Sequence, residues 1–155
     1  TVKFVSLNPY RIVVSGRIKH FTSAFGEHVI GEEVDYALQK ATDELKIEVN
    51  EYHVAPQVNP PEGGIAYHEW FIEFTSENID LNTFANKIDI ILQNKNSYYK
   101  DLRVGEMLSE LKITPLKPNA FNDYMKSIGK LGGQNKLPRL ANDRKIADEL
   151  SPFKI

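Results

Sequence analysis

Apolar residues recur every three or four positions in three stretches of the chain, at residues 31–46, 80–91 and 118–128. This spacing gathers them on one side of an amphipathic helix, so the sequence predicts a helix in each stretch. The residues that form the three apolar stripes are Val34, Ala37, Leu38, Ala41 and Leu45, then Leu81, Phe84, Ile88 and Ile91, and finally Phe121, Tyr124, Met125 and Ile128.

Capping residues stand at the starts of three predicted helices. Asp80 precedes the second apolar stripe and is a good N-cap, because its carboxylate accepts hydrogen bonds from the first free amides of a helix. Pro118 and Asn119 are predicted to start the third helix. Beyond it, Asn142 or Asp143 is predicted to cap a short last helix. A helical or irregular segment is expected at residues 94–105.

Shorter stretches, several of them alternating in polarity, predict strands at residues 2–5, 10–14, 16–21, 29–30, 47–55, 66–74 and 108–114. Asn8-Pro9 supplies a turn between the first two strands, and Phe25-Gly26-Glu27 a turn between the next two. The strands at 47–55 and 66–74 are expected to pair antiparallel across a loop rich in proline and glycine. The sequence therefore predicts an α+β fold, in which helices pack on a small, mostly antiparallel sheet.

Two groups of ionisable residues outside the basic end of the chain are candidates for chemistry. Glu32, Glu33 and Asp35 open the first helix, where negative charge suits the positive end of the helix dipole, and they are interpreted as structural. His53 and His68 fall on neighbouring predicted strands, which raises the hypothesis of a shared metal ion. No third ligand stands at a recognisable spacing, so hydrogen-bonded histidines are the preferred interpretation.

Composition narrows the class of protein. The 155 residues suffice for one domain with a real core. Cysteine is absent, which excludes disulfides, zinc–thiolate sites and thiol nucleophiles. No apolar run approaches the roughly twenty residues that span a bilayer, and no signal-peptide pattern opens the chain. We expect a cytoplasmic protein with no membrane partner, and the first residue, Thr1, suggests a chain cut from something longer.

Charge is distributed unevenly along the chain. Residues 112–155 carry nine Lys and Arg against four Asp and Glu, whereas residues 1–111 carry ten against seventeen. A chain with a net charge of −2 thus has a cationic end. Such an end suits an anionic partner, either a nucleotide phosphate or a nucleic acid backbone.

Within that end, Lys130, Lys136 and Arg139 surround the glycine pair Gly132-Gly133. The segment is no P-loop, because that motif needs a Gly-Lys-Ser or Gly-Lys-Thr ending between a strand and a helix. One interpretation is a helix that ends in a left-handed cap at Gly129, followed by a solvated basic loop. The other is a phosphate-contacting loop, which Pro138 favours because it stiffens the backbone between the cations.

Three segments together resemble a known family. They are residues 16–27, His68-Glu69-Trp70-Phe71-Ile72-Glu73-Phe74, and residues 129–145 with their Gln134-Asn135-Lys136-Leu137-Pro138-Arg139 motif. In this order they are similar to the C-terminal part of bacterial members of the auxin-responsive acyl-acid amido synthetase family, within the adenylate-forming superfamily. The resemblance implies that ATP, accompanied by Mg2+, activates a carboxylic acid as an acyl-adenylate. An amine, typically an amino acid, then attacks to form an amide.

The resemblance also implies roles for individual residues. Lys136 matches the lysine that reaches the adenylate and its phosphates, where a compact cation offsets charge developing during attack by the carboxylate. Lys130, in a Gly-Lys pattern found in other branches of the superfamily, is the second choice. Arg17 and Gln134 correspond to the nucleotide site, and Lys19 to the hinge. Pro138 and Arg139 are expected to brace the loop, and no residue of this chain is expected to bind a metal.

By the same resemblance, residues 1–18 are the end of an N-terminal domain with linker strands, and residues 19–155 form a mobile C-terminal domain. The large N-terminal adenylation domain would be its partner, and the isolated chain should be inactive and bind no cofactor. Two alternatives remain. One is a stand-alone ligand- or protein-binding α+β module. The other is nucleic-acid binding through the basic residues, which is disfavoured because no aromatic residues are interleaved with them for base stacking.

Overall fold

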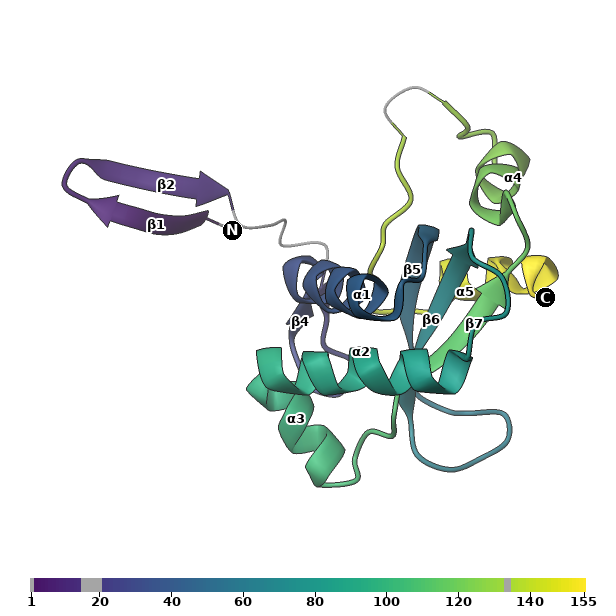
Figure 1. Cartoon of the computed structure of the whole chain (residues 1–155), viewed down its shortest axis with the longest axis horizontal. Helices are drawn as coiled ribbons and strands as arrows, with labels where there is room; N and C mark the ends of the chain where they lie inside the picture. The colour runs from purple at the N-terminus through teal and green to yellow at the C-terminus, as the bar shows by residue number, and fades with distance from the viewer. Residues whose placement is uncertain (1, 15–20, 133–134) are drawn as a thin grey trace.

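The structure is a computed structural model that describes residues 2–14, 21–132 and 135–155 (Figure 1). In chain order its elements are β1 (Val2–Leu7), β2 (Tyr10–Val14), β3 (Phe21–Thr22), β4 (Val29–Ile30), α1 (Gly31–Leu45), β5 (Val49–Gln57), β6 (Tyr67–Phe74), α2 (Leu81–Lys95), α3 (Ser97–Val104), β7 (Lys112–Leu116), α4 (Ala120–Ser127), α5 (Lys145–Glu149) and the 3-10 turn η1 (Ser151–Phe153).

A three-stranded sheet in the order β5-β6-β7 forms the centre of the molecule. β5 and β6 pair antiparallel, with Val54 opposite Trp70, as the sequence predicts. β7 pairs parallel to β6, with Ile113 opposite Trp70. The parallel direction follows from the connection, since α2 and α3 carry the chain back before β7 begins. The predicted fold class, α+β with helices on a small and mostly antiparallel sheet, is confirmed.

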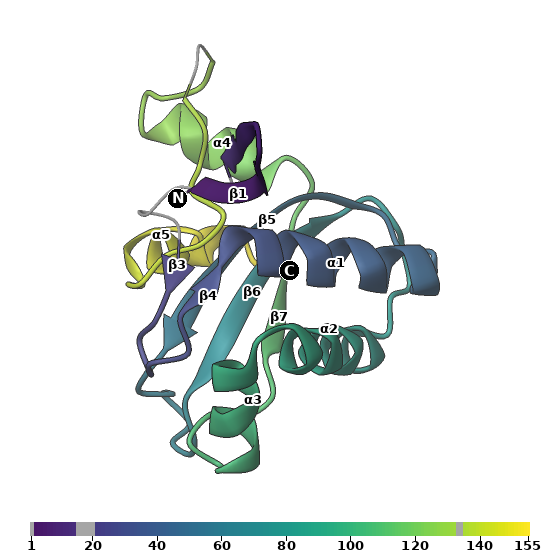
Figure 2. The ribbon, with the colours of Figure 1, turned by 90° about the vertical axis from the view of Figure 1, so that its left-hand side faces the viewer.

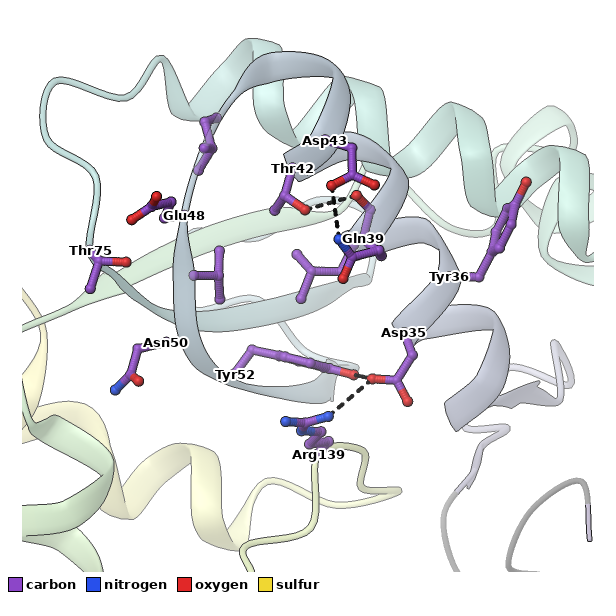
Figure 3. A pocket seen from close by; sticks show the side chains of 13 residues that line it. Asp35, Tyr36, Gln39, Thr42, Asp43, Glu48, Asn50, Tyr52, Thr75 and Arg139 are labelled. Carbon is purple, nitrogen blue, oxygen red and sulfur yellow. Dashed lines mark hydrogen bonds and ion pairs between the residues drawn. The ribbon is translucent and has the colours of Figure 1, made fainter.

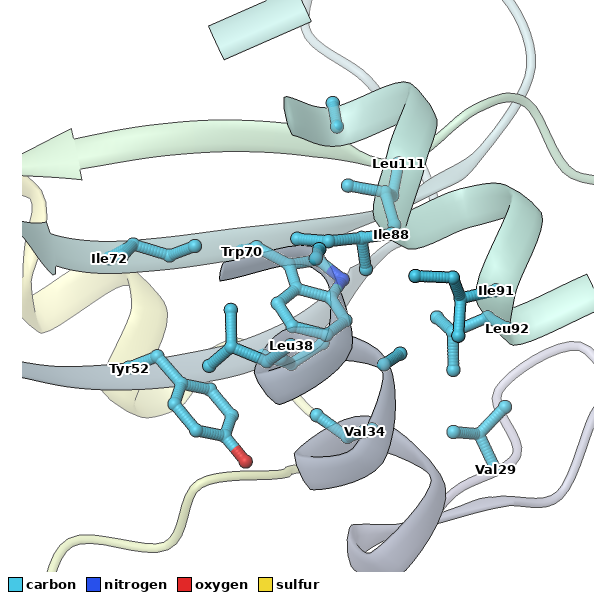
Figure 4. Close-up of a cluster of buried hydrophobic side chains, with 14 of the residues drawn as sticks. Val29, Val34, Leu38, Tyr52, Trp70, Ile72, Ile88, Ile91, Leu92 and Leu111 are labelled. Carbon is cyan, nitrogen blue, oxygen red and sulfur yellow. The ribbon is translucent and has the colours of Figure 1, made fainter. Parts of the chain in front are cut away.

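Side chains of β6 alternate between two separate cores because successive residues of a strand point to opposite faces. Trp70 and Ile72 pack under α1 and α2, in the larger core shown in Figure 4. Phe71 points the other way and packs with α4 and α5 in a smaller core. Figure 2 shows these helices on either side of the strands. Strand β6 is therefore buried on both faces.

Two hairpins precede the sheet along the chain. β1 pairs antiparallel with β2, which confirms the first predicted hairpin, and β3 pairs antiparallel with β4 around the predicted turn at residues 25–27. Of the strand predicted at 16–21, residues 16–20 lie outside the described residues. The β1–β2 hairpin projects from the body of the molecule (Figure 1). β3–β4 instead leads directly into α1.

Helix caps show where local sequence rules hold and where a distant residue takes over. Asp80 accepts from the amides of Asn82 and Thr83 at 3.1 Å, as predicted. Asn119 does occupy the N-cap of α4, but its side chain makes no capping bond. The cap is supplied instead by buried Glu73 of β6, which accepts from the Phe121 amide in the first turn at 3.3 Å and from the Asn119 amide at 2.9 Å. No helix in the described part of the chain has the length and hydropathy to cross a membrane.

Candidate functional site

The basic loop begins where α4 ends. Gly129 has a left-handed φ of +67°, and the Lys130 amide donates to the carbonyl of Met125 at 2.8 Å. These features are typical of a helix that closes on a glycine, so the predicted left-handed cap is confirmed. The cap turns the chain away from the sheet and leaves Lys130 exposed.

We expect Gly129→Ala to lower the free energy of unfolding by about 1–2 kcal/mol, because a β-carbon is disfavoured in the left-handed conformation. Nothing lies within 4 Å of the position that the new methyl group would take, so backbone conformation is the only cause. Urea unfolding followed by circular dichroism measures the change. Gly129→Asn is the matched control and should cost less, since asparagine tolerates this conformation; equal losses would contradict the explanation.

The returning half of the loop is fixed to the edge of β5. The Val54 amide donates to the Arg139 carbonyl at 2.8 Å, and the Ala141 amide donates to the Val54 carbonyl at 3.0 Å. Leu140, between them, forms a parallel bridge with Val54 and is buried in the larger core. Residues 139–141 thus act as a short extra strand, which anchors the segment that follows Lys136.

Arg139 adds side-chain contacts to this anchor (Figure 3). Its Nε donates to Glu51 at 2.8 Å, one terminal nitrogen donates to Asp35 at 3.3 Å, and its guanidinium lies 5.1 Å from the centre of the Tyr52 ring. The Tyr52 hydroxyl also donates to Asp35, at 2.5 Å. Burial and this bond to the Asp35 carboxylate raise the pKa of Tyr52, so the phenol stays protonated. The Arg139 side chain therefore joins α1 and β5 to the loop.

The Arg139 cluster lies at one end of an open pocket of about 880 Å³ between α1 and β5. Asp35, Asp43 and Glu48 line the pocket with Arg139. Three carboxylates against one guanidinium that is already paired make this hollow unfavourable for phosphate. An anion would therefore bind more favourably at the basic loop than in this pocket.

Lys130 and Lys136 are the cations that the described part of the loop leaves available. Both are exposed, and neither side chain has an ion pair or hydrogen bond to any described residue. Pro138, two residues after Lys136, is half-buried, and its carbonyl oxygen lies 2.7 Å from Nδ1 of His53. Lys136 therefore stands next to fixed backbone while its ammonium group faces solvent. Three predicted site residues, Arg17, Lys19 and Gln134, lie outside the described residues.

The metal hypothesis for His53 and His68 does not fit the geometry, because the two rings lie on opposite faces of the sheet. His68 points into the helix-covered face and donates from Nε2 to the buried carboxylate of Glu27 at 2.8 Å. His53 points to the other face, toward Pro138. Within the described residues, no three histidine or acidic side chains converge on a metal-sized site.

Several contacts of the site carry no signal in the sequence. Asn142, predicted as a possible helix cap, instead accepts from the amide of Ser23 at 2.8 Å, while Asp143 accepts from the Lys145 amide at the start of α5. Asp35 lies early in α1, as predicted, yet it also holds Arg139. The Ser23–Asn142 and Arg139–Asp35 bonds join residues 119 and 104 positions apart, so only the folded structure identifies them. The Asp143–Lys145 bond is local and falls where the sequence predicts a cap.

Comparisons with known proteins agree with this architecture. Residues 32–145 match the family model described as the GH3 family C-terminal domain. The fold is similar to solved structures of the GH3.15 acyl acid amido synthetase (TM-score 0.74, 16% identity) and of AtGH3.15 acyl acid amido synthetase in complex with 2,4-DB (TM-score 0.69, 16% identity). Each similarity covers 94% of this chain, which spans only 28% and 27% of those two chains. No curated protein matches the sequence.

Proposed function

We propose, because this chain belongs to the GH3 family, that it works as the C-terminal domain of an ATP-dependent acyl-acid amido synthetase. The full-length enzyme would join a carboxylic acid to AMP, release pyrophosphate, and then transfer the acyl group to an amine, typically that of an amino acid. Residues 19–155 would be the mobile domain. Residues 1–18 would end the N-terminal adenylation domain and link it to this one. We place the enzyme in the cytoplasm.

One observation supports this proposal most directly: Lys136 is an exposed cation without a counter-ion among the described residues, next to a backbone segment fixed at Pro138, Arg139 and Leu140. A lysine ammonium without a counter-ion can approach a phosphate without first breaking an ion pair. In the proposed reaction it would lie against the α-phosphate, where negative charge grows as the carboxylate attacks. Electrostatic stabilisation of charge that develops in the transition state is commonly the largest single contribution to catalysis.

Other residues have supporting roles in the proposal. Arg139 and Pro138 would brace the loop, since the Arg139 guanidinium is occupied by Glu51 and Asp35. Arg17 and Gln134 would contact the nucleotide, and Lys19 would lie at the hinge. Lys130, exposed on the other arm of the loop, is the alternative catalytic lysine.

ATP would arrive with Mg2+ bound to its phosphates. The described residues offer no converging group of histidine or acidic side chains for the ion. The pockets that select the acid and the amine would lie in the rest of the full-length protein.

The test is acid-dependent exchange of pyrophosphate into ATP by the full-length protein, across a panel of carboxylic acids. We expect exchange with at least one acid, and an amide product when amino acids are added. The 155-residue chain alone should give no exchange. Exchange by the isolated chain would contradict the proposed division of labour, and absence of exchange with every acid by folded full-length protein would favour a stand-alone binding module.

A further inference from the structure

His53 is a fully buried histidine beside the loop that carries Lys136. It lies in the middle of β5, opposite Phe71 of β6, and none of its surface is exposed. Its ring faces the segment before Leu140, and its Nδ1 lies 2.7 Å from the carbonyl oxygen of Pro138. The family likeness and the basic loop do not account for a buried imidazole at this place.

The hydrogen bond fixes the protonation of the ring. A proline carbonyl has only lone pairs to offer, so Nδ1 must carry the hydrogen and donate it. Nε2 has no hydrogen-bond partner among the described residues, and an unpartnered charged N–H would be costly in this buried position. His53 is therefore neutral, with its single hydrogen on Nδ1.

The environment of the ring keeps it neutral. Burial lowers the pKa of His53 and outweighs the opposite effects of the Pro138 carbonyl and of the nearby carboxylate of Asp143. The positive charge of the Arg144 guanidinium also lowers the pKa of His53, because it repels a proton on the ring. The donor on Nδ1 is consequently present throughout the neutral pH range.

We infer that His53 is a positioning residue for the proposed reaction: its Nδ1–H holds the Pro138 carbonyl and thereby sets where Lys136 stands. This inference rests on the proposed function of Lys136. Proline cannot donate through its own nitrogen, so its carbonyl is the one backbone group through which residue 138 can be hydrogen-bonded. The bridge at Val54 fixes Arg139 and Ala141, and the His53 bond extends the fixed backbone one residue closer to Lys136.

Two substitutions separate this bond from simple packing. Asparagine at position 53 keeps an N–H donor two bonds from its β-carbon, as Nδ1 is in histidine, but it is smaller. Leucine fills the space better and has no donor. If the bond matters, His53→Leu should slow pyrophosphate exchange by the full-length enzyme about 10- to 100-fold, the scale of a displaced catalytic group, with the KM for ATP little changed. His53→Asn should retain most of the rate. If only packing mattered, the order would reverse.

A double-mutant comparison shows whether the effect passes through Lys136. In the Lys136→Ala background, adding His53→Leu should reduce the rate no further, because the group being positioned is already gone. Independent, multiplying losses would overturn the inference, and so would a wild-type rate in His53→Leu.

Nuclear magnetic resonance of the 155-residue chain gives a readout that does not depend on activity. Long-range nitrogen spectra should show His53 with hydrogen on Nδ1 alone, unchanged as the pH falls through the ordinary histidine value of about 6.5. Hydrogen on Nε2 with none on Nδ1 would overturn the inference whatever Lys136 does. If Lys136→Ala leaves the rate unchanged while the spectra are as expected, the proposed role of Lys136 fails. In that case, amide hydrogen exchange at Ala141 that is faster in His53→Leu but not in His53→Asn would still show that His53 holds the loop. Equal exchange rates in the two variants would show that it does not.

Discussion

Lys136→Ala in the full-length enzyme is expected to slow adenylate formation about 10²-fold or more, the scale of losing one electrostatic contact that acts in the transition state. The side chain is exposed and makes no ion pair with the described residues, so its removal should leave the stability of the domain unchanged. Single-turnover formation of acyl-adenylate from labelled ATP measures the effect. Binding of ATP itself should weaken much less than the rate falls.

Lys130→Ala is the matched control for this experiment. Lys130 is exposed on the same loop and has the same charge, but it lies at the helix-cap end of the loop, whereas Lys136 stands next to the segment fixed at β5. We expect at most a small loss of rate in Lys130→Ala. An unchanged rate in Lys136→Ala together with a crippled Lys130→Ala would transfer the catalytic role to Lys130.

The second large effect concerns stability: His68→Leu should lower the free energy of unfolding by about 3–5 kcal/mol, the cost of leaving a buried charge without its partner. His68 and Glu27 are both essentially inaccessible to solvent, and their side chains meet at 2.8 Å. Glu27 also accepts from the Phe25 amide at 2.9 Å. Chemical denaturation of the 155-residue chain measures the loss.

Two further variants test the cause of that loss. Adding Glu27→Leu to His68→Leu should recover part of the stability, because no charge remains buried, although the Phe25 amide loses its acceptor. His28→Asn, at an exposed histidine whose positive φ of 47° asparagine tolerates, should change stability by under about 0.5 kcal/mol. No recovery in the double variant would mean that lost packing, not the stranded carboxylate, explains the effect.

The dependence of stability on pH gives the same pair a distinct signature. Burial on its own would raise the pKa of Glu27, but the hydrogen bond and charge of His68, with backbone amides, outweigh it and lower that pKa. A carboxyl whose pKa is lower in the folded state stabilises the protein above its ordinary value, and this stabilisation disappears as the pH falls. In His68→Leu burial should win instead, so stability should fall as the pH rises above about 4.3, the ordinary glutamate value.

The sequence predicts most elements of this fold because each depends on neighbouring residues. The apolar stripe from Val34 to Ala41 identifies α1, and a carboxylate before Asn82 and Thr83 identifies the start of α2. The direction of β7 could not be predicted, since it depends on where α2 and α3 return the chain. The division of β6 between two cores was equally hidden, because Glu69 and Glu73 stand on the same face as Phe71 and make that face look exposed, although both are buried.

For the candidate site, the local sequence pattern identifies the cations of the loop but not the residues that fix the loop in place. The glycines and Pro138 mark the basic loop, and the helix cap at Gly129 follows from residue type alone. The groups that fix the loop, His53 and Glu51 of β5, are separated from Pro138 and Arg139 by 85 and 88 positions. Nothing in the residues around either end indicates such a pairing, so it appears only when β5 and the returning chain lie side by side.

The bond between the Ser23 amide and Asn142 joins the β3–β4 hairpin to the chain just beyond the anchored residues at β5. The hairpin is the first described element after residue 20, on the side from which the proposed hinge leads. If the domain turns as proposed, a rotation of the hairpin would be transmitted to the loop directly through the Ser23–Asn142 bond, without passing through the helices. Rotation of the domain and movement of Lys136 toward the nucleotide would then be coupled in a single step.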